Sequence, residues 1–441
     1  MAMLQGTSSR IFGSSGKSVI ATIVILVNAF VWYSYAFSFL TDRIAIAELS
    51  DSFLFIMAIH FLGVFSSVIF GELVSRKFKN RVRFILCWMA AGVLLFLIPL
   101  FVDVSTYLGL LTLSLSTGVT FGFGIPTCLG YFAASTKTAN RGRLGGVTFL
   151  LIGVGAYLLS LIGNEDVTLA MSVLAAWKNI GVIFLLALKP EEICVKQEQT
   201  ATYRHVFSNK SFLLYFIPWT MFLLVNSLIF PINEKIFGSD LVRMSSSIEF
   251  ILAGASAVVT GFLADSKGRK RLAMAGFALL GIGHAILGFS GNIIGWWFYT
   301  IVDGIAWGIF VTTFLFTLWG DLAEELRSEK YYAVGIMPYL LSTLLRFSFG
   351  ALIVDLAGEL SVMFSFASFF LFIAVLPLVY APETLPEKIV KELELKSYLD
   401  KAQKEANKAQ KREEDNTCEE KVNNGIEIDE EAFEESWQER H

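Results

Sequence analysis

The feature that most constrains this chain is a series of long apolar runs that recur along almost its whole length. They lie at about 18–40, 53–74, 84–102, 107–135, 145–162 and 167–188, and then at 212–230, 248–264, 272–289, 293–319, 333–356 and 361–380. A helix needs about 20 apolar residues to cross the hydrocarbon core of a bilayer, and each run is near or above that length. The pattern predicts an all-α integral membrane protein with about 12 transmembrane helices, six in each half.

The composition agrees with a membrane protein, since 55% of the 441 residues are hydrophobic and the mean hydropathy is +0.61. Charged residues crowd into the stretch after Glu387. The net charge of −4 comes largely from that stretch, so it gives no reason to expect a nucleic-acid partner. The four cysteines offer no pair on the predicted outer side, which argues against a structural disulfide. The four histidines lack metal-ligand spacing, so we expect neither a metal nor another cofactor.

The cations predict the orientation, because Lys and Arg gather in cytoplasmic loops. They follow the second, fourth and sixth runs, whereas the alternate loops hold few. Both termini are therefore expected in the cytoplasm. The predicted domains are an N-terminal segment (1–17), a six-helix bundle (18–188), a cytoplasmic linker (189–210), a second six-helix bundle (211–381) and a charged tail (382–441).

One short polar turn between two apolar runs carries the most specific motif. It reads G-F-L-A-D-S-K-G-R-K-R from Gly261 to Arg271, with Asp265 as its acid and Gly268, Arg269 and Lys270 at its end. An ordinary positively charged loop would be the simpler interpretation. The motif resembles the loop signature of the major facilitator superfamily of transporters, with every defining position filled.

A degraded copy of the motif lies 190 residues upstream (261 − 71). It keeps Gly71, Arg76 and Arg81, but Ser75 stands in place of the acid and Phe78 in place of the second glycine. The repeat supports two homologous halves.

Further signatures resemble those of the sugar-porter branch of the superfamily. Pro-Glu pairs end the sixth and twelfth runs at Glu191 and Glu383. An R-G-R sequence follows the fourth run from Arg141 to Arg143. Trp319, Glu324 and Arg327 are similar to the end of the branch's tenth helix. The sequence departs from the branch in two places. The G-P-x-P element that precedes the tryptophan is absent, and Ser135 and Thr136 stand at the end of the fourth run where the branch usually has an acid.

The resemblance implies a cytoplasmic gate built by these motifs. We expect Asp265 to face the start of the eleventh helix, with Arg269 as its partner. The residues expected to form cytoplasmic salt bridges are Arg141, Arg143, Glu191, Glu324, Arg327 and Glu383.

Three ionisable residues stand out at membrane depth, namely Lys178, Asp303 and Arg346. A charge at membrane depth is costly, so each is a functional candidate. Asp303 and Arg346 lie at comparable depth on consecutive runs, and a salt bridge between them is open geometrically. Such a pair would either fix helix packing or leave Asp303 as a gate or proton carrier. For Lys178, we favour a packing or snorkelling role.

The resemblance also implies that the first, fourth, seventh and tenth helices line a central cavity. Candidate substrate-binding side chains there are Asn28, Trp32, Tyr33, Trp219, Asn226 and Trp319, together with Asp303 and Arg346. Such groups suit a neutral polar solute such as a sugar, and they suit an amphipathic organic compound equally well.

The predicted function is transport of a small organic solute by alternating access, secondary active or facilitative, with proton coupling as one option. We expect a monomer in the bilayer of the cell membrane. A drug or metabolite exporter of the same superfamily and a membrane sensor with a transporter fold are the alternatives. An enzyme is the weakest interpretation, because the sequence contains no visible nucleophile–base or metal constellation.

Overall fold

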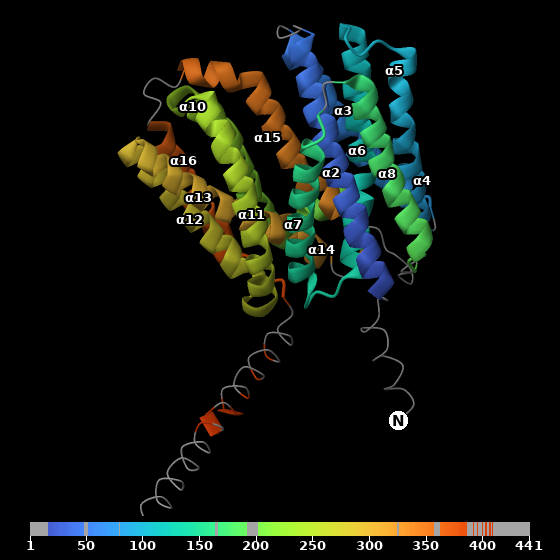
Figure 1. Cartoon of the computed structure of the whole chain (residues 1–441). Helices are drawn as coiled ribbons and strands as arrows, with labels where there is room; N and C mark the ends of the chain where they lie inside the picture. The colour runs from blue at the N-terminus through green and yellow to red at the C-terminus, as the bar shows by residue number, and fades with distance from the viewer. Residues whose placement is uncertain are drawn as a thin grey trace, which may run out of the picture. The chain divides into compact units, whose positions relative to one another are not determined.

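The computed structural model describes residues 16–47, 52–78, 80–163, 166–191, 202–323, 326–356 and 362–385, with isolated positions between 391 and 408. Every regular element in these ranges is helical. The chain divides into a compact unit, Met1–Leu385, and a second unit, Pro386–His441. All helices named below belong to the first unit (Figure 1).

The first half of this unit is built from six successive helical segments. They are α2 (Gly16–Ile46), α3 (Phe53–Ser75), the interrupted segment α4 (Arg81–Val93), η2 (Leu94–Leu97) and α5 (Ile98–Phe101), then α6 (Tyr107–Ser135), α7 (Arg141–Ser160) and α8 (Val167–Leu188). The interruption has a local cause. Pro99 lacks an N–H group and its ring crowds the carbonyl four residues earlier, and the helix tightens to 3-10 geometry just before it.

The second half repeats this arrangement after the short helix α9 (Tyr203–Ser208). It consists of α10 (Lys210–Phe237), α11 (Ser239–Lys267), α12 (Arg269–Ser290), then α13 (Ile293–Phe310) continued by the π-helical η3 (Val311–Leu318) and α14 (Trp319–Leu322), α15 (Glu329–Leu356), and finally α16 (Val362–Ile373) with α17 (Val375–Tyr380).

Among the described residues, eleven helices are long and apolar enough to cross a membrane. The remaining predicted run, 84–102, is the interrupted segment α4–η2–α5, which continues to Phe101. Each of the twelve predicted runs therefore contains a helix in the part of the chain that the structure describes, and the predicted all-α membrane fold is confirmed.

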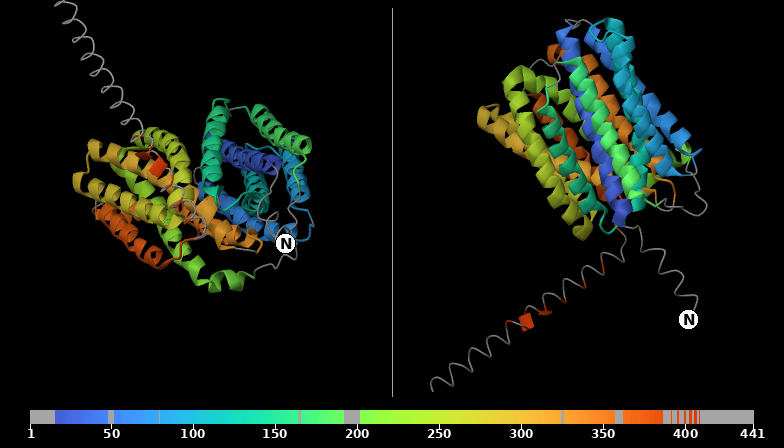
Figure 2. Two further views of the ribbon diagram at one scale, coloured as in Figure 1. Left: turned by 90° about the horizontal axis from the view of Figure 1, so that it is seen from below. Right: turned by 45° about the vertical axis from the view of Figure 1, so that its right-hand side comes forward.

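The two halves pack side by side as separate groups of helices, which Figure 2 shows end-on in its left panel. Their main contacts join α7 to α11 and η3, and α15 to α3 and α6. Glycines bring α7 and α11 together, because a Cβ atom on Gly261 would clash with the carbonyl group of Gly142. Small residues of this kind allow close backbone approach between membrane helices.

Candidate functional site

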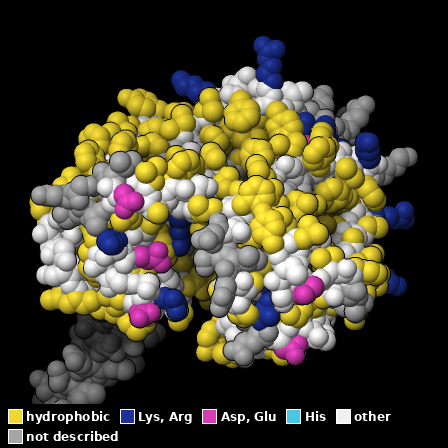
Figure 3. All heavy atoms as spheres, turned by 90° about the horizontal axis from the view of Figure 1, so that it is seen from above, with side chains coloured by type: hydrophobic (Ala, Val, Ile, Leu, Met, Phe, Trp, Pro, Cys, Tyr) yellow, Lys and Arg dark blue, Asp and Glu magenta, His cyan; other side chains and the backbone are white. Residues whose placement is uncertain are grey.

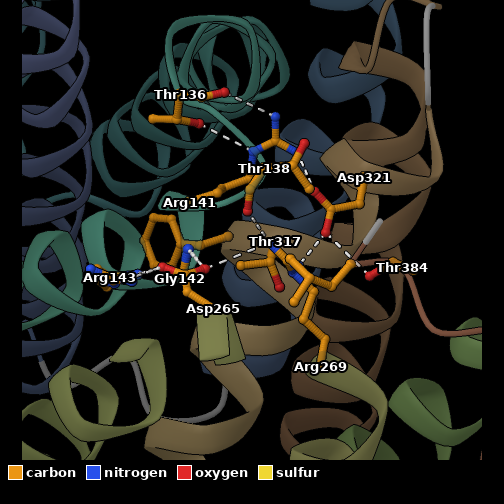
Figure 4. A network of polar contacts seen from close by, with 12 residues as sticks. Thr136, Thr138, Arg141, Gly142, Arg143, Asp265, Arg269, Thr317, Asp321 and Thr384 are labelled. Atoms are coloured by element: carbon orange, nitrogen blue, oxygen red, sulfur yellow. Dashed lines mark hydrogen bonds and ion pairs between the residues drawn. The ribbon is translucent and has the colours of Figure 1, made fainter. Parts of the chain in front are cut away.

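A network of charged side chains lies where the ends of α11 and α14 meet the starts of α7 and α12. We call Arg141, Asp265, Arg269 and Asp321 the ion network (Figure 4). All four side chains are at most 7% exposed. The end of the molecule that contains them is called the network face below.

Asp265 binds the start of α7 through two backbone hydrogen bonds. The N–H groups of Gly142 and Arg143 donate to its two carboxylate oxygens, each at 2.9 Å. A helix N-terminus favours an anion in this position. The side chains of Arg143 and Arg269 lie farther away, at 3.5 Å and 3.7 Å from the carboxylate.

This contact corrects the predicted partner of Asp265. The prediction placed it at the start of the eleventh helix, which is α15, whereas the structure places it at the start of the fifth, α7. The cause is the packing of α11 along α7, since Gly261 and Gly142 bring the end of one helix against the start of the other.

Asp321 is the centre of the ion network. Its carboxylate pairs with the guanidinium of Arg141 from the first half, and with that of Arg269 at 2.7 Å from the second half. The hydroxyl group of Thr384 also donates to it, at 3.2 Å. Sequence reasoning missed Asp321, although its position at the end of the tenth apolar run, two residues after Trp319, was a usable signal.

The two arginines also donate hydrogen bonds to backbone carbonyl groups of the first half. Arg141 donates to the carbonyl oxygens of Ala133 and Thr136, and Arg269 donates to the carbonyl oxygen of Thr138 at 2.6 Å. The three carbonyl groups belong to the end of α6 and the turn that follows it. The network therefore joins the halves through both ion pairs and backbone contacts.

A second link between the halves lies at the start of α15. Arg81 of the degraded motif copy pairs with Glu329 at 2.7 Å, and Arg327 approaches the same oxygen at 3.1 Å. Glu329, which sequence reasoning also missed, is 1% exposed. The motif copy lacks its own acid, and its Arg81 pairs instead with Glu329, an acid at the start of α15.

Arg76 of the same copy stays within its own half. It pairs with Glu72 at 2.9 Å, and the hydroxyl group of Tyr203 on α9 donates to Glu72 at 3.3 Å. Burial, together with this carboxylate, raises the pKa of Tyr203, so the hydroxyl group keeps its proton. Ser75, which replaces the acid, donates only to the carbonyl oxygen of Glu72.

The two Pro-Glu pairs have different surroundings. Glu383 accepts from the backbone N–H groups of Arg269 and Lys270 at 2.9 Å and 3.2 Å, and so caps the start of α12. Glu191 is exposed, and its carbonyl oxygen accepts from Tyr131 at 3.2 Å. Arg271 is exposed as well. The predicted salt-bridge residue Glu324 lies outside the described residues.

The predicted tryptophans lie in the interiors of the halves. Trp32, Trp219 and Trp319 are at most 4% exposed. The indole N–H of Trp219 donates to the carbonyl oxygen of Gly335 at 2.8 Å. The side chain of Asn28 donates to the carbonyl oxygen of Trp177 on α8. These residues brace helices against one another in this conformation.

Tyr33 differs from them because it is half-buried and contacts a buried histidine. Its hydroxyl oxygen lies 2.8 Å from Nε2 of His60, and Nδ1 of His60 lies 3.0 Å from the carbonyl oxygen of Ser114. The ring of Tyr33 also stacks on Phe121 with a centroid distance of 3.7 Å.

Asp303 and Arg346 have separate partners, and no ion pair joins these two described residues. The side-chain amide of Asn226 donates to Asp303 at 3.5 Å, whereas the guanidinium of Arg346 lies 3.3 Å from the ring centroid of Phe230. Asp303 interacts electrostatically with Glu249 on α11, an acid that sequence reasoning missed. The salt bridge considered from the sequence is therefore not formed in this structure.

Lys178 is fully buried in the first half. Its Nζ atom lies 4.7 Å and 4.0 Å from the ring centroids of Trp32 and Trp88. These cation–π contacts hold it between α2 and α4, as expected for a packing role.

Comparison with known proteins places this geometry in a known fold. No family model matches the chain, and neither does any curated protein sequence. Among solved structures, the chain is similar to the proton:xylose symporter XylE bound to 6-bromo-6-deoxy-D-glucose, with 16% identity, a TM-score of 0.62, and coverage of 86% of this chain and 97% of that one.

Two more structures give the same result. The transporter FucP in the outward conformation has 10% identity and a TM-score of 0.65, over 83% of this chain and 99% of that one. The human organic anion transporter MFSD10 has 12% identity and a TM-score of 0.59, over 82% and 99%. The chain is a multi-pass membrane protein with the fold of the major facilitator superfamily of transporters.

Proposed function

We propose that this protein is a secondary transporter that moves a small organic solute by alternating access. The observation that carries the proposal is the closure of one end by polar contacts between the halves. Arg141 with Asp321, the start of α7 with Asp265, and Arg81 with Glu329 all join the halves at the network face. These contacts would form and break as the halves rock about a central site.

The opposite face supports an open path from the other side. Figure 3 shows that face, where a notch runs between the two lobes of the molecule. FucP, to which the chain is similar, was solved in the outward conformation. We therefore assign the network face to the cytoplasm, in agreement with the distribution of cations, and the chain to the cell membrane as a monomer with bundles at 18–188 and 211–381.

In this proposal the ion network stabilises the closed state and can be broken when the halves move apart. A buried charge whose partner leaves must be rehydrated or paired again. Opening the network face would admit water to Arg141, Arg269 and Asp321 and so offset the lost ion pairs. The network can thus favour the closed state without making it permanent.

A counterflow assay in proteoliposomes tests the function. Vesicles loaded with a mixture of unlabelled sugars, organic anions and organic cations are exposed to a labelled member of each class. We expect transient accumulation of at least one class in vesicles with the protein, and none in empty vesicles. Absence of exchange across the whole panel, with protein shown to be folded and inserted, would contradict transport.

A further inference from the structure

We infer that the central site binds an organic cation through an ammonium group. The inference rests on the proposed transport function and names its substrate class. It follows from the hydrogen-bonding polarity of side chains in the two halves.

In the second half, two acids lie together on neighbouring helices. The carboxylates of Glu249 on α11 and Asp303 on α13 are close enough to interact electrostatically. Their helices are in direct contact, because a Cβ atom on Gly304 would lie 2.9 Å from the carbonyl oxygen of Glu249. Within the described ranges neither acid has a Lys or Arg partner, and Arg346 is held against Phe230 instead. Two carboxylates in this setting favour a positively charged ligand.

Further polar side chains converge on these acids from α10. Asn226 donates to Asp303. Asn233 is 4% exposed, and its Oδ1 atom has no hydrogen-bond partner among the described residues. Its side chain is hydrogen-bonded to the hydroxyl group of Tyr299, which is also hydrogen-bonded to Asp303. An amide oxygen buried without a donor is costly, and a ligand N–H group would satisfy it.

The ligand class follows from what surrounds the carboxylates. Tyr299 and Trp307 lie four residues before and after Asp303, so the three side chains share one face of α13. Aromatic faces beside a carboxylate suit an organic ammonium group. A metal ion fits less well, because the described residues contain no group of three His, Cys, Asp or Glu side chains placed to hold one.

The first half contributes another acceptor. The carbonyl oxygen of Ser114 can only accept, so Nδ1 of His60 carries the proton in this contact. An imidazolium would be a charge buried without a carboxylate partner, so the ring is neutral and its Nε2 atom accepts from the hydroxyl group of Tyr33. With its proton engaged by His60, the oxygen of Tyr33 can only accept from a ligand. Tyr339 on α15, 45% exposed, lies near enough to interact with Tyr33 across the halves.

A set of matched ligands tests the inference. Benzylammonium, benzyl alcohol and benzoate share one ring and differ in charge, and xylose represents neutral polyols. We expect benzylammonium to raise the melting temperature of the purified full-length protein and to support counterflow, with at least tenfold preference over the other three. A preference for benzoate, benzyl alcohol or xylose, or binding of none of the four, would overturn the inference.

Variants locate the site. Asp303→Asn and Glu249→Gln should each weaken benzylammonium binding by tenfold or more, whereas Asp240→Asn at the exposed start of α11 should not. Tyr33→Phe should weaken it about fivefold, and Tyr35→Phe, whose hydroxyl group bonds to Gly163 instead, serves as its control. Unchanged binding in both acid variants would reject this site.

The two proposals fail in distinguishable ways. Exchange of sugars or organic anions without a response to benzylammonium would leave transport standing and remove the cation site. Saturable benzylammonium binding that depends on Asp303, without exchange of any solute, would leave the site standing and contradict transport.

Discussion

Arg141 on α7 and Asp321 on α14 form a buried ion pair between the two halves of the molecule. Asp321 pairs at the same time with Arg269 on its own half. One carboxylate therefore pairs with two guanidinium groups. This sharing makes Asp321 the position whose loss should affect the network most.

Asp321→Asn should open the network face. The change leaves two buried arginines without their shared carboxylate, and breaking such a pair typically costs roughly 3–5 kcal/mol. A cysteine at Ala133, which packs against Gly320 between the halves, reports the opening through its rate of maleimide labelling in a background without native cysteines. We expect faster labelling in Asp321→Asn, and an unchanged rate in Asp355→Asn at the exposed end of α15.

Arg141→Gln should have a smaller effect than Asp321→Asn, because Arg269 keeps its carboxylate partner. Equal labelling rates in the two variants would show that Arg269 does not help to keep the network face closed. A wild-type rate in Asp321→Asn would mean that the network does not hold the halves together.

Asp265→Asn should impair transport more than it impairs folding. An asparagine offers one oxygen to two N–H donors and turns its own NH₂ group toward one of them. Hydrogen bonds to a charged group contribute about 1.5–3 kcal/mol, so the closed state should lose that much. We expect counterflow to fall tenfold or more with a melting temperature near that of the wild type. Wild-type exchange would remove Asp265 from the gate.

The helices were predictable because lipid forces regular apolar runs, but their ends were not. The eighth run was predicted from Ile248, whereas α11 begins at Ser239. The intervening turns contain Asp240, Arg243 and several serines, and their low hydropathy predicts a loop. Once a helix is packed against neighbours, its polar first turns can face water at the membrane surface.

The candidate site was predictable by position but not by partner. The motif located Asp265 and Arg269 because its spacing is specific. Their partners Gly142, Asp321 and Glu383 come from remote segments, and helix packing decides which segment arrives. Glu249 was missed because it is only the second residue of the predicted run 248–264, whereas α11 begins at Ser239 and carries it against Gly304.

The orientation can be tested with single cysteines in a background without native cysteines. One at Ser290, where α12 ends, should react with an impermeant thiol reagent applied outside cells, and one at Ser266, beside the ion network, should react only after the membrane is opened. Both positions are exposed in the structure, so burial does not confound the comparison. The reverse pattern would place the network face outside.

Gly268 permits a quantitative test of the motif. It adopts φ +95, and a Cβ atom there would also collide with the carboxylate of Glu383. Gly238 has a similar backbone conformation, because its φ and ψ are 86° and 143° and those of Gly268 are 95° and 158°. A Cβ atom added to Gly238 would have no described atom within 4 Å. Gly238→Ala should therefore show the backbone strain alone, roughly 1–3 kcal/mol, and Gly268→Ala the strain plus the clash.

The melting temperature should accordingly fall further in Gly268→Ala than in Gly238→Ala. Adding Glu383→Ala to Gly268→Ala removes the colliding carboxylate, so the double variant should recover part of the difference in melting temperature. The recovery is only partial, because the hydrogen bonds from the start of α12 to Glu383 are lost in the single variant and in the double variant. In the wild-type background, Glu383→Ala should only destabilise, because Arg269 and Lys270 lose their N–H acceptor. Equal effects of the two glycine variants would show that Glu383 does not set the need for glycine at this turn.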